Sequence, residues 1–110
     1  MSSEIEMQIM MYCEAINTGT KSVAMMNIQT RYTPKLKQIT EKENLHVYIK
    51  NVASDQNWKI AYIYKYSYLI DVIKIAPEYP SSIYDHWVLG KLFGYSDEAI
   101  ELFVTKLFDN

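Results

Sequence analysis

The sequence contains little cysteine, glycine and proline, and these shortages exclude several classes of site. Cys13 is the only cysteine, so no disulfide can form within the chain. None of the three glycines opens a phosphate-binding loop or a nucleophile elbow. His46 and His86 stand apart from other metal ligands, and Cys13 has no partner at zinc-finger spacing. The sequence therefore predicts a protein that is not an enzyme, with no catalytic residue, cofactor or metal.

Long apolar stretches are missing as well. No run approaches the roughly 18 apolar residues of a membrane span, and the methionine-rich start lacks the basic flank and small-residue cleavage site of a signal peptide. We therefore expect a cytoplasmic protein without a membrane partner. Its 110 residues, 49% of them hydrophobic and 22% charged, are typical of one globular domain covering residues 1–110.

Charge is unevenly distributed along the chain, although the net value is only −2. Residues 1–20 carry three glutamates and no base, and residues 76–110 carry two lysines against six acidic residues. The middle, residues 21–75, carries nine basic against four acidic residues. This division predicts a surface with separate acidic and basic regions.

A first helix is predicted at the start of the chain. Ser2 or Ser3 can cap it, and the polar residues 17–20 end it. Its apolar residues recur at helical spacing: Ile5, Ile9, Tyr12, Cys13 and Ile16. Cys13 then belongs to the buried stripe, which predicts a core residue rather than a reactive thiol.

The region between residues 21 and 53 is harder to assign. Residues 22–26 fit a short helix and residues 28–32 alternate like a strand, and both alternatives stay open. Thr33 and Pro34 mark the start of a helix that runs to about Glu43. Residues 45–49 alternate and are rich in β-branched and aromatic side chains, which predicts a strand.

Two structures compete from Asp55 to Ala76. Tyrosines at 62, 64, 66 and 68 repeat every second residue as in a strand, whereas the wider segment fits a helix that starts after Ser54 and stops at Pro77. The segment has more than twenty residues and no Gly or Pro inside, so it is much longer than an ordinary strand. We therefore predict one helix here.

The clearest pattern lies between Ser82 and Phe108. Ser81 or Ser82 can cap a helix that Gly94 ends, and Ser96 can cap a last helix with acidic residues in its first turn. The apolar residues of this last helix share one face: Ile100, Phe103, Val104, Leu107 and Phe108. The predicted fold is mainly α, a small helical domain that ends in a helix-turn-helix hairpin bent at residues 94–96, with short strands only within residues 28–50.

The spacing of this hairpin also matches a DNA-binding motif. Gly90, Gly94 and Ile100 stand where such motifs have a small residue, a turn glycine and a packing apolar residue. The helix that would enter the major groove, residues 95–104, carries three acidic residues and no base. Affinity for DNA depends on Lys and Arg that neutralise phosphates. The charges therefore favour a protein partner over DNA.

Two further patterns carry less weight. Asp85 and His86 are neighbours, but adjacent residues on a helix point about 100° apart and do not form an acid–base pair. In the basic middle, lysines interleave with tyrosines, which suits single-stranded nucleic acid: Lys35, Lys37, Lys42, Lys50, Lys59 and Lys65 with Tyr48, Tyr62, Tyr64 and Tyr66. Because the chain has a single arginine and a negative net charge, direct nucleic-acid binding is the less favoured alternative.

Residues 85–100, DHWVLGKLFGYSDEAI, resemble a C-terminal motif of small phage proteins from low-GC bacteria. The resemblance implies a non-enzymatic protein that inhibits or modulates a host protein complex, as anti-CRISPR proteins and other inhibitors of host defence do. The expected partner is a host protein, for example a nuclease that is bound at its basic nucleic-acid channel. The residues predicted to bind it are Asp85, Tyr95, Asp97, Glu98 and Glu101. The alternatives are a helix-turn-helix DNA-binding regulator and a small virion structural or assembly protein, and the oligomeric state stays open.

Overall fold

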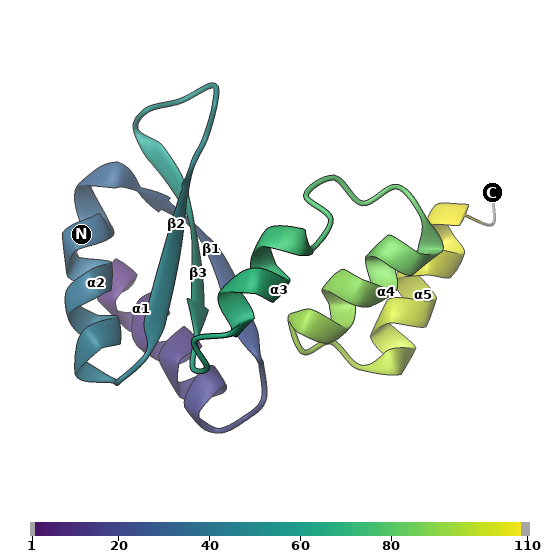
Figure 1. The fold of residues 1–110 in the computed structure, drawn as a ribbon, viewed down its shortest axis with the longest axis horizontal. Coiled ribbons are helices and arrows are strands. Elements are labelled where there is room, and N and C mark those ends of the chain that lie inside the picture. The colour runs from purple at the N-terminus through teal and green to yellow at the C-terminus, as the bar shows by residue number, and fades with distance from the viewer. Residues whose placement is uncertain (1, 109–110) are drawn as a thin grey trace.

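The computed structural model describes residues 2–108, with side chains from residue 4 onward, and shows an α+β fold (Figure 1). Along the chain the elements are α1 (Ser2–Asn17), β1 (Val23–Gln29), the short 3-10 helix η1 (Thr30–Tyr32), α2 (Thr33–Lys42), β2 (His46–Asn51), β3 (Trp58–Tyr64), α3 (Leu69–Ile75), α4 (Ile83–Leu92) and α5 (Asp97–Phe108). The prediction of a mainly helical domain ending in a helix-turn-helix hairpin is therefore wrong, because a three-stranded sheet organises the first half of the chain.

The sheet has the strand order β1-β3-β2, and β3 pairs antiparallel with both neighbours. Ala61 in the centre of β3 faces Met26 of β1 on one side and Ile49 of β2 on the other. Since β1 and β2 both run against β3, they are parallel to each other, and α2 makes the crossover between them. Helices α1 and α2 lie on one side of the sheet, and α3, α4 and α5 lie on the other (Figure 1).

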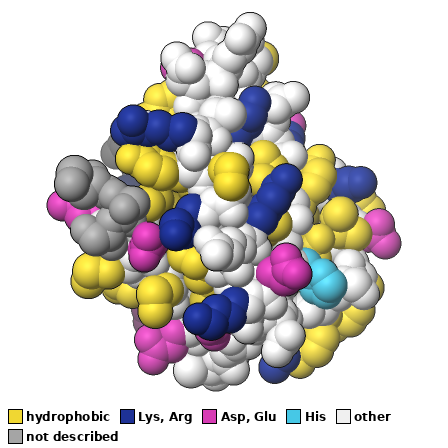
Figure 2. Space-filling view, turned by 90° about the vertical axis from the view of Figure 1, so that its left-hand side faces the viewer, with side chains coloured by type: hydrophobic (Ala, Val, Ile, Leu, Met, Phe, Trp, Pro, Cys, Tyr) yellow, Lys and Arg dark blue, Asp and Glu magenta, His cyan; other side chains and the backbone are white. Residues whose placement is uncertain are grey.

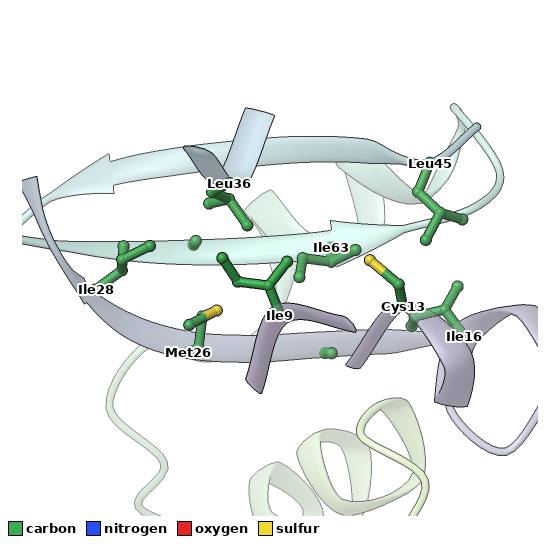
Figure 3. Packing of buried hydrophobic residues seen from close by; sticks show 10 residues of the cluster. Ile9, Cys13, Ile16, Met26, Ile28, Leu36, Leu45 and Ile63 are labelled. Atoms are coloured by element: carbon green, nitrogen blue, oxygen red, sulfur yellow. The ribbon is translucent and has the colours of Figure 1, made fainter. Parts of the chain in front are cut away.

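The main core fills the space between the sheet and the helices α1 and α2. Figure 3 shows Ile9 and Cys13 of α1 pointing toward Ile63 of β3. The buried members of this cluster are Ile9, Cys13, Ile16, Ala24, Met26, Ile28, Leu36, Leu45, Ala61 and Ile63. The predicted apolar stripe of α1 is confirmed, and so is the burial of Cys13, while the cap predicted at Ser2 or Ser3 lies outside the described side chains. Burial raises the pKa of the Cys13 thiol to about 11, with a smaller contribution from Glu43, so the thiol is protonated at neutral pH.

The single helix predicted from Asp55 to Ala76 is wrong. The segment divides into strand β3 and helix α3, with a turn at residues 65–68 that contains neither Gly nor Pro. The alternation of Tyr62 and Tyr64 with Ala61 and Ile63 was the relevant pattern, since the two sets lie on opposite faces of a strand that is hydrogen-bonded along both edges. Pairing with two distant strands outweighs the local helical periodicity.

Other elements follow the sequence patterns more closely. The segment left open at residues 21–32 contains strand β1 and the turn η1. Helix α2 begins at Thr33, with Pro34 in its first turn as predicted, and ends at Lys42, one residue before the predicted end at about Glu43. The strand expected at residues 45–49 is β2, shifted by one to two residues.

A second, smaller cluster lies on the other face of the sheet. Val23, Tyr64 and Ile73 are buried there, and Leu92 and Phe93 from the end of α4 pack against them. The Lys21 Nζ donates a hydrogen bond of 2.6 Å to the carbonyl oxygen of Phe93. We call α4 and α5 together, residues 83–108, the C-terminal lobe. These contacts connect the lobe to the sheet through the end of α4.

Candidate functional site

The helices of the C-terminal lobe start where their sequences predict. The Ser82 hydroxyl oxygen accepts a hydrogen bond of 3.1 Å from the backbone N–H of Asp85, and the Ser96 hydroxyl does the same, also at 3.1 Å, for Ala99. Each serine thus satisfies a backbone donor that has no partner within the helix. Gly94, between the helices, has a φ of 83°, a left-handed conformation that favours glycine.

Gly90 brings the two helices into close contact. A Cβ atom at this position would lie 2.6 Å from the Cδ1 atom of Ile100, so a larger residue would force the Ile100 side chain or α5 itself to shift. Gly90, Ile100 and Val104 are the only buried residues among those described in α4 and α5. The spacing of Gly90 and Ile100, which resembles that of DNA-binding motifs, therefore serves the packing of these two helices.

Much of the apolar surface of the lobe is exposed among the residues that the structure describes. The stripe predicted for the last helix contains Ile100 and Val104, which are buried, but Phe103, Leu107 and Phe108 are 54%, 51% and 42% exposed. Other exposed apolar side chains of the lobe are Ile83, Tyr84, Tyr95 and Leu102. Large exposed apolar patches mark interaction sites in soluble proteins.

An apolar groove runs between the two helices. It has a volume of about 460 Å³ and is lined by His86, Leu89, Gly90, Phe93, Tyr95, Ala99, Ile100 and Phe103. His86 is its principal polar side chain. The centroid of the His86 ring lies 5.2 Å from the ring centroid of Phe103 and 5.8 Å from that of Phe108. We refer to this feature as the α4–α5 groove. Of the five residues predicted to bind a partner, Tyr95 alone lines it.

Asp85 and His86 do not act together. The Asp85 carboxylate accepts a hydrogen bond of 3.1 Å from the backbone N–H of Ser81, which lowers the pKa of that carboxyl. Together with the cap at Ser82, this bond fixes the start of α4. Asp85 therefore stabilises a helix end, on the side of α4 that faces Val72 and Ile75 of α3.

The remaining predicted residues occupy different positions on α5. Asp97 forms an ion pair of 2.8 Å with Lys91 across the turn between the helices. Successive residues on a helix are turned by about 100°, so Glu98 and Glu101 lie on the flank of α5 opposite Ala99 and Phe103. Both glutamates are exposed, and Glu101 accepts a hydrogen bond of 3.3 Å from Thr105. The acidic flank and the apolar groove are thus on opposite sides of one helix.

The basic middle of the chain offers a less open surface than the sequence indicates. Tyr48 and Tyr62 stack on neighbouring strands with their ring centroids 6.0 Å apart, and the Lys74 Nζ lies 5.4 Å from the centre of the Tyr48 ring. Lys50 forms an ion pair of 2.8 Å with Glu78, which raises the pKa of this lysine. Part of the aromatic surface and one of the lysines that would bind a nucleic-acid strand are therefore already engaged.

Groove-lining residues such as Leu89, Phe93 and Phe103 did not enter the sequence-based choice of site, which rested on charge and resemblance. A sequence signal that could have indicated the groove is the wide apolar face between residues 83 and 93. This face is wider than a single partner helix covers.

Two kinds of site are missing from the part of the chain that the structure describes. No three His, Cys, Asp or Glu side chains converge there as metal ligands. None of the helices between residues 2 and 108 has the length and apolar character needed to cross a membrane.

No family model matches the chain, and no curated protein is significantly similar to it in sequence.

Proposed function

We propose that the protein is a non-enzymatic interaction protein that binds an apolar helical segment of a partner protein in the α4–α5 groove. The observation that carries this proposal is the groove itself, whose lining is almost entirely apolar and lies beside exposed Phe103 and Leu107. Two helices that pack at Gly90 and Ile100 leave a place for a third helix along their shared apolar side. Helix-in-groove recognition uses this arrangement, with anchor residues at helical spacing.

The acidic flank of α5 adds a second element to the proposed interface. Glu98 and Glu101 lie on the side of α5 that faces away from the groove. A partner that wraps around α5 would therefore contact the groove with one part of its surface and the two carboxylates with another. A basic partner surface would then be steered into place, as the predicted inhibitor of a host nuclease requires. That inhibitor class, implied by the phage-protein resemblance of residues 85–100, stays a prediction.

The test compares two aspartate substitutions on opposite sides of α5. The tagged full-length chain captures bound proteins from a cell lysate, and the same capture is repeated with Phe103→Asp and Thr105→Asp. Both side chains are exposed, so neither change is expected to unfold the chain. We expect Phe103→Asp to lose a partner that the wild type and Thr105→Asp retain, whereas identical captures by all three chains would refute the groove as the binding site.

A second measurement asks whether the groove is covered by another copy of the chain. Light scattering after size-exclusion chromatography should give the monomer mass over a wide range of concentration. A dimer that Phe103→Asp dissociates would show that the groove serves self-association, and the proposal of a separate partner would fail.

A further inference from the structure

A second uncovered apolar surface lies on α1, at the opposite end of the molecule from the lobe. Met7, Met10 and Met11 are 64%, 58% and 68% exposed, although α1 already buries its other face against the sheet. Met7 and Met11 lie about half a turn from the buried stripe of Ile9 and Cys13. Helix α1 therefore carries apolar residues on two faces, and packing of the fold uses one of them.

These methionines line a groove of about 440 Å³, together with three polar residues, Glu14, Asn17 and Glu43. We refer to it as the methionine groove. Figure 2 faces this side of the molecule and shows hydrophobic side chains next to acidic ones, with Lys and Arg side chains elsewhere on the same face. Unbranched, polarizable methionine side chains adapt to different ligand shapes, and proteins use them on surfaces that bind helices.

Both charged residues that line the groove are acidic. Glu14 lies in the last turn of α1, which ends at Asn17 and has no basic residue there, and Glu43 is the C-cap of α2. The C-terminus of a helix carries a partial negative charge and therefore favours a cation. Each of the two carboxylates adds a further negative charge at such a helix end. Lys42 of α2 is adjacent in sequence but does not line the groove. Negative potential is therefore concentrated at this end of the groove.

We propose that the methionine groove binds a basic amphipathic helix of a second protein, with apolar side chains on Met7, Met10 and Met11 and with Lys or Arg opposite Glu14 and Glu43. Charge complementarity selects this occupant. A nucleic acid would be repelled by the two carboxylates. A second copy of the chain would bring the same carboxylates into one two-fold interface, where like charges oppose each other.

The position of the methionines makes the proposal directly testable. All six methionines of the chain precede residue 27, so the C-terminal lobe contains none. Met26 is buried in the core, and Met25 lies on the other face of the sheet from α1. In the full-length chain with 13C-labelled methionine methyl groups, Met7, Met10 and Met11 therefore report on the groove, and Met25 and Met26 serve as internal controls.

The probe is a synthetic amphipathic peptide of about 14 residues, with leucine on one helical face and lysine on the flanks. Its matched control has glutamate in place of every lysine. We expect the basic peptide to shift the methyl signals of Met7, Met10 and Met11, to leave Met26 unchanged, and to bind more weakly as salt is added. Unmoved groove signals, or equal binding of the acidic peptide, would overturn the proposal.

Variants locate the contact on this surface. The double change Glu14→Lys with Glu43→Lys should weaken binding of the basic peptide on the order of tenfold, since it removes two ion pairs. Met10→Gln removes an apolar contact without changing charge and should also weaken it. The matched control, Asp55→Lys with Asp71→Lys, changes two exposed carboxylates that line neither groove and should bind like the wild type. If this control loses binding and the groove variants keep it, the peptide binds elsewhere on the surface and the proposal fails. The Met26 signal verifies that each variant is folded.

Discussion

The two ends of the molecule use apolar residues in opposite ways. Among the described residues, twelve of the fifteen buried hydrophobic side chains lie between Ile9 and Tyr64, and three lie in the helices after residue 69. Of the seventeen large hydrophobic side chains that are exposed, twelve follow residue 65. The first part of the chain thus makes its own core, whereas the C-terminal lobe presents apolar surface that another molecule would have to cover.

The largest effect is expected from a cavity in the core of the first part. Ile63→Ala removes a fully buried side chain that packs against α1, and should cost about 2 to 5 kcal/mol of unfolding free energy. Urea unfolding followed by circular dichroism measures it. The comparison variant, Leu102→Ala on the exposed surface of α5, should cost less than about 1 kcal/mol. Similar losses for both would mean that the two regions are equally well packed.

The second-largest effect is expected at alkaline pH, which should destabilise the first part of the chain. The pKa of Cys13 is raised from 9.0 to about 11, so the folded state holds its proton more tightly than the unfolded state. The contribution of the Cys13 thiol to the unfolding free energy is fully present below pH 9. About 2 to 3 kcal/mol of it is lost as the pH rises from 9 through about 11. Burial also raises the pKa of Tyr62 and Tyr64, which adds to the loss in the same direction.

Unfolding free energy measured against pH tests this expectation. The Cys13→Ala variant is less stable because of its cavity, but its alkaline slope should be shallower than that of the wild type. Parallel curves for the two chains would show that Cys13 does not contribute to the pH dependence.

A smaller and more local effect is expected in the lobe. Gly90→Ala places a methyl group 2.6 Å from the Ile100 side chain and should cost about 1 to 3 kcal/mol. Hydrogen exchange should accelerate in α4 and α5 while β1 and β3 keep their protection. Gly19→Ala is the control, because a methyl group there meets no atom within 4 Å, although its positive φ strains any side chain. Equal acceleration in the sheet would show that the two regions unfold together.

The smallest effect on stability belongs to the residue with the largest proposed role in binding. Phe103→Ser removes a half-exposed ring that packs beside His86 and should change the unfolding free energy by less than about 1 kcal/mol, while it abolishes partner capture. Thermal unfolding and the capture experiment on the same sample measure both. A large loss of stability would place Phe103 in the core of the lobe rather than on its binding surface.

Local patterns predicted several elements because their causes are local. Helix α1, the start of α2 and the serine caps at Ser82 and Ser96 depend on residues within one or two helical turns of each other. Strand β3 was not predicted, because its stability comes from β1 and β2, and no glycine or proline marks its end at Tyr64. Length alone was a misleading criterion for this segment.

The candidate site shows the same limit. Charge pattern and resemblance drew attention to Asp85, Asp97, Glu98 and Glu101, yet one of these carboxylates binds the backbone at a helix start and another is paired with Lys91. The apolar residues between α4 and α5 form the groove. An amphipathic pattern does not specify which part of a wide apolar face remains uncovered, because that depends on elements far away in the sequence.

The sequence by itself determined the helix boundaries at Ser82, Gly94 and Ser96, the buried position of Cys13 and the uneven distribution of charge, since each depends on near neighbours or on composition. Only the tertiary structure decided that Tyr62 and Tyr64 belong to a central strand, that Glu98 and Glu101 lie opposite the groove, and that the methionines of α1 face solvent beside Glu14 and Glu43. Each of these depends on which distant segments pack together, and packing selects one of several faces that the local pattern leaves equivalent.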